Sequence, residues 1–177
     1  MFKNYQLFYK KLSAPLREAP VAVGILKQLS KFLTGFIYLV YPCLLIFVFW
    51  RSWQNSVSFE GYLVLAFPYL IIPALSFILL TVIRKLINQP RPYEQWHISP
   101  LIEKKTKGNS MPSRHVFSAT VIAMCGLKVN LILGIFLLIL SVIIAFIRVI
   151  GGVHYPKDVI IGFLAGVLTG LCLFLVR

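Results

Sequence analysis

The sequence predicts an all-α membrane protein, a polytopic bundle of about five transmembrane helices preceded by an N-terminal interfacial amphipathic helix. Hydrophobic residues make up 59% of the 177 residues and charged residues 13%, against about 45–50% and about 25% in soluble domains. The mean hydropathy is +0.85, and a soluble fold of this composition would expose more apolar surface than soluble proteins carry. The length fits a single membrane domain over residues 1–177.

The first 30 residues are predicted to lie in the membrane interface. Apolar and aromatic residues recur there at helical spacing among lysines, namely Phe2, Tyr5, Tyr9 and Leu12. This pattern is typical of a helix that rests its apolar side on a lipid surface. Residues 19–30 are expected to form a second amphipathic piece that extends the first span backwards.

Five apolar stretches approach the roughly 20 residues that cross a hydrocarbon core about 30 Å thick. We predict spans at about 32–50, 62–83, 116–127, 131–147 and 159–176. The third stretch is short and has to use residues 113–115 for its first turn. The last stretch carries Gly162, Gly166 and Gly170, a stripe of small residues that favours close packing inside the bundle over dimerisation.

Ionisable residues gather at three span ends, where hydrocarbon makes them costly unless they serve a function. The three clusters are Arg84, Lys85 and Arg91-Pro92, then Pro112-Ser113-Arg114-His115, then Arg148, His154 and Asp158. Because five spans alternate in direction, all three clusters fall on the same side of the membrane. We therefore expect them to meet in one pocket at the interface.

The basic residues of these clusters suit a phosphate ligand. Guanidinium groups match phosphate oxygens with two parallel hydrogen bonds. Ser113 has the residue type of an N-cap, so the backbone N–H groups after it would point at an anion. The net charge of +13 is spread between apolar runs, which favours a phosphate-bearing lipid and the bilayer as partners and disfavours nucleic acid.

His154 and Asp158 carry the predicted chemistry. Asp158 is the only aspartate, four residues after a histidine, and Pro156 is placed to open the last helix. A carboxylate that holds one imidazole nitrogen leaves the other free as a nucleophile, and His115 is free to protonate the leaving oxygen. Each residue alone has a simpler explanation, because boundary histidines are commonly interfacial and boundary cations anchor the topology. Their joint occurrence favours phosphoryl transfer through a phosphohistidine.

The same residues resemble the type 2 phosphatidic acid phosphatase (PAP2) superfamily of membrane lipid phosphatases. The motifs of that family run Lys-x6-Arg-Pro, Pro-Ser-Gly-His and Ser-Arg-x5-His-x3-Asp. The chain has, in the same order within residues 84–158, Arg84-x6-Arg91-Pro92, Pro112-Ser113-Arg114-His115 and Ile147-Arg148-x5-His154-x3-Asp158.

The resemblance implies a role for each matching residue. His154 is expected to attack phosphorus, Asp158 to orient it, and His115 to protonate the leaving group. The residues expected to hold the phosphate oxygens are Arg91, Ser113 and Arg148. The resemblance implies that neither a metal nor a cofactor takes part.

Three positions depart from the family motifs. Arg84 replaces a lysine and Lys85 follows it, so either one is a candidate for the first cation. Arg114 replaces a glycine, and its extra charge is expected either to grip a second anionic group or to crowd the site. Ile147 replaces a serine and loses a hydroxyl.

The resemblance predicts a metal-independent hydrolase of a lipid phosphate or diphosphate in the cell membrane of a bacterium. Phosphatidic acid, phosphatidylglycerophosphate and polyprenyl diphosphates such as undecaprenyl diphosphate are the candidate substrates. The alternative is a non-catalytic phospholipid-binding or transport protein that keeps the anion pocket. The superfamily also contains soluble vanadium haloperoxidases, with which five spans do not agree.

The side of the membrane that the site faces has two competing indications. Most loop cations lie on the predicted catalytic side, and the opposite side has only Arg51, Lys128 and Arg177. The positive-inside rule then places the site toward the cytoplasm. The larger bacterial members of the family, however, resemble six-span bundles whose site faces outward. The sidedness and the oligomeric state therefore stay open.

Overall fold

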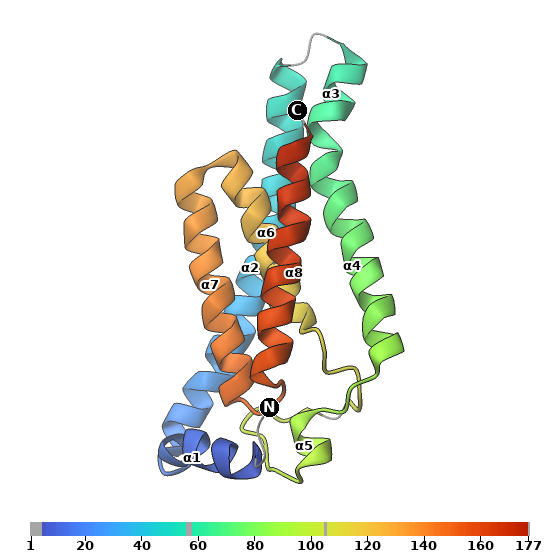
Figure 1. Cartoon of the computed structure of the whole chain (residues 1–177). Helices are drawn as coiled ribbons and strands as arrows, with labels where there is room; N and C mark the ends of the chain where they lie inside the picture. The colour runs from blue at the N-terminus through green and yellow to red at the C-terminus, as the bar shows by residue number, and fades with distance from the viewer. Residues whose placement is uncertain (1–4, 56–57, 105, 177) are drawn as a thin grey trace.

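The computed structural model describes residues 5–55, 58–104 and 106–176. Within these ranges every regular element is an α-helix, which confirms the all-α class. The helices are α1 (Tyr5–Arg17), α2 (Pro20–Asn55), α3 (Phe59–Ala66), α4 (Pro68–Ile87), α5 (Pro92–Gln95), α6 (Arg114–Val129), α7 (Leu131–Ile150) and α8 (Pro156–Leu175) (Figure 1). Two residues named above, Phe2 and Arg177, lie outside the described ranges.

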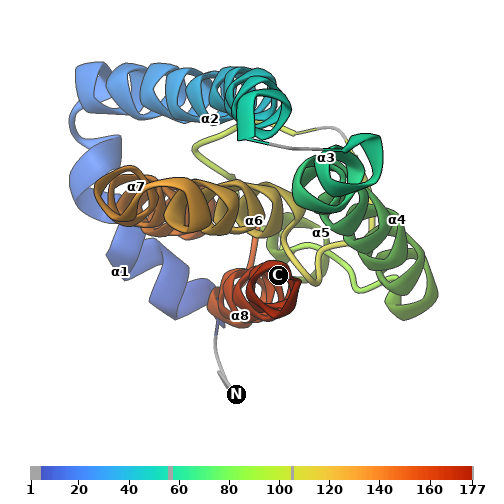
Figure 2. The same cartoon turned by 90° about the horizontal axis from the view of Figure 1, so that it is seen from above.

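Helix α6 forms the centre of the bundle. It packs against α2, α4, α7 and α8 (Figure 2), and nearly all of its residues from Val116 to Gly126 are buried. The main hydrophobic core forms along it, where Ala119 and Ala123 meet Leu137 of α7. The start of α6, which carries one of the three polar clusters, is therefore held from several sides.

Four helices are long and apolar enough to cross a membrane, namely α2, α4 together with the residues up to Gln95, α7 and α8. Helix α6 has 16 residues and rises about 24 Å at 1.5 Å per residue, short of a hydrocarbon thickness of about 30 Å. The expected five spans are thus four candidate spans and one shorter central helix. Because its neighbours surround α6, this helix needs little lipid-facing surface.

The second predicted span, 62–83, has the wrong bounds. The predicted helix is interrupted at Phe67, between the end of α3 and the start of α4 at Pro68. Proline lacks the backbone N–H that would continue a helix across this point. Helix α4 then runs on until Asn88, whose left-handed backbone, with a φ of 40°, ends it. This longer course carries Arg84 to the end of the bundle where the polar clusters meet.

The N-terminal segment is helical as predicted, but its aromatic face contacts protein. Helix α2 begins at Pro20 and continues through the first span without a break, which confirms the backward extension. In α1, Tyr5 and Tyr9 are buried, and the rings of Tyr5 and Tyr155 have centroids 4.8 Å apart. The hydroxyl of Tyr9 donates to the Ile150 carbonyl at 3.2 Å. The face expected to rest on lipid instead covers the loop that leads into α8.

The glycine stripe of α8 faces α6. A Cβ added to Gly166 would lie 2.7 Å from the Cβ of Thr120, and one added to Gly162 would lie 2.8 Å from the Ser113 carbonyl oxygen. Both distances are too short for a side chain. The stripe therefore serves packing within the bundle, and the dimerisation alternative is wrong for this face.

Candidate active site

Helix ends and two loops form a polar site at the end of the bundle where α1 and α5 lie (Figure 1). Main-chain hydrogen bonds join segments far apart in the sequence. The N–H of Ser113, before α6, donates to the carbonyl of Asp158 in α8 at 2.9 Å. The N–H of His154 donates to the carbonyl of Arg148, near the end of α7, at 3.3 Å. The clusters that were predicted to share a pocket do lie together.

His154 and Asp158 form a buried pair at the start of α8. Nδ1 of His154 lies 3.6 Å from Oδ2 of Asp158, and their side chains are 1% and 0% exposed. The same carboxylate oxygen accepts the Tyr155 N–H at 3.1 Å. The Ser110 hydroxyl also donates to it at 2.5 Å and lies 3.4 Å from Nδ1 of His154. The carboxylate is therefore fixed by two donors while it faces the imidazole.

The protonation state of His154 follows from its surroundings. Burial and the charge of Arg91, opposed by the neighbouring Asp158 carboxylate, together lower the pKa of His154 to about 4. The imidazole is therefore neutral near pH 7 and keeps a lone pair. A neutral imidazole with one nitrogen held by a carboxylate can attack an electrophile through the other.

Arg91 connects the long loop between α4 and α6, which contains the short helix α5, to the loop that carries His154. Its Nη1 donates to the Val153 carbonyl and its Nε to the Gly108 carbonyl, both at 3.1 Å. Its main-chain N–H donates to a carboxylate oxygen of Glu94 at 2.7 Å. Nη2 makes no hydrogen bond with any described residue, so one arm of the guanidinium is left for a ligand.

Two buried donors of the site, the hydroxyl of Ser113 and Nε of Arg148, have no hydrogen-bond partner among the described residues, and neither has the acceptor Oδ1 of Asp158. Arg148 is oriented by Thr34 of α2, whose hydroxyl oxygen accepts from Nη2 at 3.1 Å. Leaving a buried polar group unpaired costs about 1–3 kcal/mol, so a ligand that pairs with both donors is favoured. Ser113 stands at the N-cap position of α6 as predicted, but its hydroxyl does not cap the helix. It adds to an N-terminus that already favours an anion.

The remaining predicted phosphate ligands are Arg84, Lys85 and Arg114, and only Arg84 is buried in the site. The guanidinium of Arg84 is buried and donates to the carbonyls of Pro112 and Asn109. Lys85, the next residue, is exposed, and so is Arg114. Arg84 and Lys85 were the two candidates for the cation of the first motif. Of these, Arg84 reaches the site, where it holds the loop before α6 through the Pro112 and Asn109 carbonyls. Ile147, in place of the family serine, is buried in the hydrophobic core.

Two residues that the sequence reasoning missed belong to the site. Ser110 holds Asp158, as described above. Lys104 is one of the loop cations that the positive-inside argument counted on the catalytic side, yet its side chain is partly buried among arginines. Burial, together with the charges of Arg91 and Arg148, lowers the pKa of Lys104 to about 8. Burial lowers the pKa of His115, which is half-buried in the first turn of α6, and the charges of Arg148 and Lys104 act in the same direction. This imidazole is therefore neutral near pH 7 and becomes a proton donor only beside a bound anion.

The arrangement has the parts of a phosphoryl-transfer site. One neutral histidine is held by a carboxylate, and a second histidine begins the neighbouring helix. Unpaired donors and several fixed cations surround them. This combination can bind a tetrahedral oxyanion and provide both a nucleophile and a proton donor.

The chain resembles known proteins in both sequence and fold. Residues 61–177 match the family model of the PAP2 superfamily, more than half of the chain. The crystal structure of LpxE from Aquifex aeolicus is similar, with a TM-score of 0.70 and 23% identity, over 98% of this chain and 96% of that chain. The first transmembrane PAP2 type phosphatidylglycerolphosphate phosphatase from Bacillus subtilis is similar with a TM-score of 0.57 and 22% identity, over 95% and 91%. No curated protein matches the chain. At these identities the two structures show a shared fold.

Proposed function

The chain belongs to the PAP2 superfamily, and on this premise we propose that it is an integral-membrane phosphatase of a lipid phosphate or diphosphate. One observation carries the proposal. A neutral His154 held by Asp158 lies in the same site as two unpaired polar groups, Ser113 Oγ and Arg148 Nε. The histidine is the nucleophile, and the unpaired groups cradle the phosphate oxygens.

In the proposed reaction, Nε2 of His154 attacks phosphorus and forms a P–N bond while the P–O bond to the leaving group breaks. Protonated His115 gives its proton to the leaving oxygen, and an alcohol or a phosphate departs. Neutral His115 then takes a proton from a water molecule, which attacks the phosphohistidine. The P–N bond breaks and inorganic phosphate leaves. The negative charge of the bound phosphate favours the proton on His115 that the first step needs.

We assign the phosphate oxygens to four side chains, Arg91, Arg148, Lys104 and Ser113, together with the free N–H groups at the start of α6. Their positive charge offsets the charge that develops in the transition state. Arg84 acts as a positioning residue, because its donors are engaged with the loop before α6. Fixed cations here supply the charge that a metal ion supplies in other phosphatases, so the proposed turnover needs no metal.

A lipid substrate is favoured by an apolar groove that begins beside the site. The groove has a volume of about 380 Å³ and lies between α2, α4 and α6. Tyr38 marks its polar end, one turn after the Thr34 that orients Arg148, and Ser118 lies one turn after Arg114. Phe77 and Val121 line its apolar part. We propose that a hydrocarbon tail lies in this groove while the phosphate reaches His154.

The substrate class follows from this combination of a single anionic site and a tail groove. Phosphatidic acid, phosphatidylglycerophosphate and polyprenyl diphosphates all present a terminal phosphate on an apolar tail. The B. subtilis structure, by its description, is a phosphatidylglycerolphosphate phosphatase, which makes that lipid the first to test here.

The test is phosphate release by the purified protein from these three lipids, in the presence of a chelator, with His154→Asn as the control. We expect release from at least one lipid and none by the variant. Binding of a lipid phosphate without release, by wild-type protein that is folded, would instead support the non-catalytic alternative. The departures from the family motifs at Arg114 and Ile147 do not alter the His154–Asp158 pair, since Arg114 is exposed and Ile147 lies in the core.

A further inference from the structure

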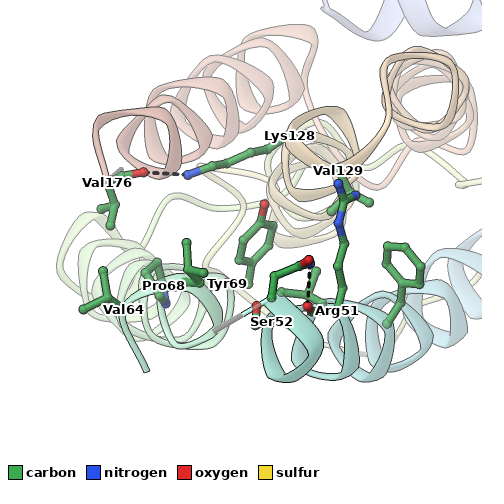
Figure 3. A pocket seen from close by; sticks show the side chains of 12 residues that line it. Arg51, Ser52, Val64, Pro68, Tyr69, Lys128, Val129 and Val176 are labelled. Atoms are coloured by element: carbon green, nitrogen blue, oxygen red, sulfur yellow. Dashed lines mark hydrogen bonds between the residues drawn. The ribbon is translucent and has the colours of Figure 1, made fainter. Parts of the chain in front are cut away.

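A second polar pocket lies at the end of the bundle opposite the candidate active site. It has a volume of about 330 Å³ and is formed by α2, α3, α4, α6 and the residue after α8 (Figure 3). Its polar lining includes two cations, Arg51 and Lys128, and none of the described residues that line it is Asp or Glu. Glu60 is in the first turn of α3 but is not part of the lining. The pocket is therefore a positively charged cavity.

Lys128 is fixed in this pocket by the end of α8. Its amine donates to the carbonyl of Val176 at 2.8 Å (Figure 3) and to the carbonyl of Leu173. It also lies 5.8 Å from the centre of the Tyr69 ring. An ammonium group has three donors, so one remains after these two hydrogen bonds. A fixed ammonium group with one donor left favours an anion beside it.

The guanidinium of Arg51 is not engaged by the described part of the protein. The side chain extends from α2 along the pocket toward Val129 (Figure 3). It makes no hydrogen bond or ion pair with a described residue, and only the Arg51 main-chain carbonyl accepts a bond, from Asn55 at 2.8 Å. A guanidinium matches phosphate oxygens with paired hydrogen bonds. The guanidinium of Arg51 thus has donors available for a phosphate group beside the fixed ammonium of Lys128.

An apolar groove continues from the pocket along the outside of the bundle. Its volume is about 440 Å³, and it shares Phe47 and Val129 with the pocket. From Phe47 it follows α2 to Leu39 and is bounded on the other side by Leu133 of α7. Eight helical residues correspond to about 12 Å, directed toward the middle of the bundle. The groove therefore leads from the charged pocket into the depth that acyl chains occupy.

We propose that this pocket and groove bind an anionic phospholipid of the leaflet opposite the active site. The headgroup phosphate pairs with Arg51 and the remaining donor of Lys128, and one acyl chain lies in the groove beside Phe47. The occupant is not a substrate, because no histidine is among the described residues that line the pocket. It joins α2, α6 and the end of α8, and so stabilises the bundle where the helices are joined by short connections. The competing explanation treats Arg51 as a simple topological anchor, which would not distinguish one headgroup from another.

The experiment measures the thermal unfolding midpoint of the purified protein in detergent micelles. The additions are phosphatidylglycerol, phosphatidylcholine or soluble glycerol phosphate. A ligand that binds only the folded state raises the midpoint. We expect phosphatidylglycerol to raise it by several degrees, phosphatidylcholine to raise it clearly less, and glycerol phosphate to leave it unchanged.

Variants test whether the shift depends on Arg51. Arg51→Gln is expected to lose at least half of the phosphatidylglycerol shift, whereas Arg51→Lys retains most of it. Lys31→Gln, an exposed cation on the catalytic half of α2, is the matched control and keeps the full shift. An unchanged shift in Arg51→Gln overturns the proposal, and so does an equal shift with phosphatidylcholine or with glycerol phosphate. If Arg51→Gln does not fold, the proposal is tested by the midpoint shifts that the three additions cause in the wild type and in Arg51→Lys.

This proposal is independent of catalysis. Phosphate release by Arg51→Gln in detergent micelles that contain phosphatidylcholine is expected to match that of wild type. A missing lipid shift with normal release would contradict only the second site, and a normal lipid shift without release would contradict only the phosphatase.

Discussion

The main-chain N–H of Ser113 donates to the main-chain carbonyl of Asp158 at 2.9 Å, and this bond joins the start of α6 to the first turn of α8. The residue that offers its hydroxyl to the proposed phosphate site is thus connected to the carboxylate that holds His154. Gly162 lies directly behind this junction, where a Cβ would come within 2.8 Å of the Ser113 carbonyl oxygen. Helix packing therefore sets the spacing between the phosphate cradle and the nucleophile.

Gly162→Leu is expected to push α6 away from α8 and to disturb that spacing. Overpacking of this kind costs about 1–3 kcal/mol of unfolding free energy, and we expect most of the phosphate release to be lost. Gly35→Leu on α2 is the matched control, because a Cβ there meets nothing within 4 Å. Thermal unfolding and phosphate release are measured on both. Equal behaviour of the two variants would contradict the packing role of Gly162.

Ser110→Ala is expected to reduce kcat with little change in KM, because Ser110 touches Asp158 and His154 and is not one of the proposed phosphate ligands. A hydrogen bond to a charged group contributes about 1.5–3 kcal/mol, which corresponds to a loss of roughly 10–150-fold in rate. Ser99→Ala, at an exposed position of the same loop, is the control and should retain wild-type kcat. The measurement is steady-state kinetics with the lipid from which phosphate is released fastest. A kcat of Ser110→Ala equal to that of Ser99→Ala would contradict a role of Ser110 in positioning Asp158 and His154.

Lys104 predicts a specific pH dependence. Its pKa is lowered to about 8, and a lysine carries its charge below its pKa, so the site loses a cation as the pH rises through about 8. We expect kcat/KM to fall in this range for the wild type. Lys104→Arg keeps its charge, so the fall should move to higher pH, whereas the exposed Lys107→Arg should behave like the wild type. Superimposable profiles for all three proteins would contradict a phosphate-binding role for Lys104.

Neutralisation of Arg84 is expected to reduce stability and turnover, whereas neutralisation of Lys85 is expected to leave both unchanged. Arg84→Gln removes the donors to the Pro112 and Asn109 carbonyls, and we expect a loss of about 2–4 kcal/mol in unfolding free energy, because hydrogen bonds to charged groups are involved. Its kcat should fall as the loop before α6 loses its position. Lys85→Gln changes an exposed side chain and should retain both stability and turnover. The reverse pattern would assign the first-motif cation to Lys85.

The parts of the fold that the sequence predicts are those governed by composition and local pattern. Long apolar runs predict the membrane helices, and Pro156 correctly predicts the start of α8. The break at Phe67 was missed because the apolar run continues through it, and only the missing N–H of Pro68 interrupts the helix. The aromatic face of α1 was misjudged for a related reason. A helix that packs on protein and one that rests on lipid have the same periodicity.

For the site, the sequence predicts the residues that belong to spaced motifs, and the structure brings these together at one end. It could not predict the partners that come from irregular segments. Ser110 and Lys104 lie in the long loop, where neither spacing nor periodicity indicates which side chains turn inward. The choice between Arg84 and Lys85 depends on the direction in which the last turn of α4 faces, and that direction is set by the bounds of the helix. Motif spacing alone does not predict the direction of this turn.

The central claim is that His154 becomes covalently phosphorylated during turnover. The most direct measurement is a rapid-quench reaction with a lipid phosphate that carries ³²P, followed by denaturation at alkaline pH and isolation of labelled peptides. We predict an acid-labile, base-stable label on the peptide that contains His154, formed before phosphate is released and absent from His154→Asn. Phosphate release by His154→Asn at the wild-type rate, or turnover by wild type with the label on another residue, would contradict the account.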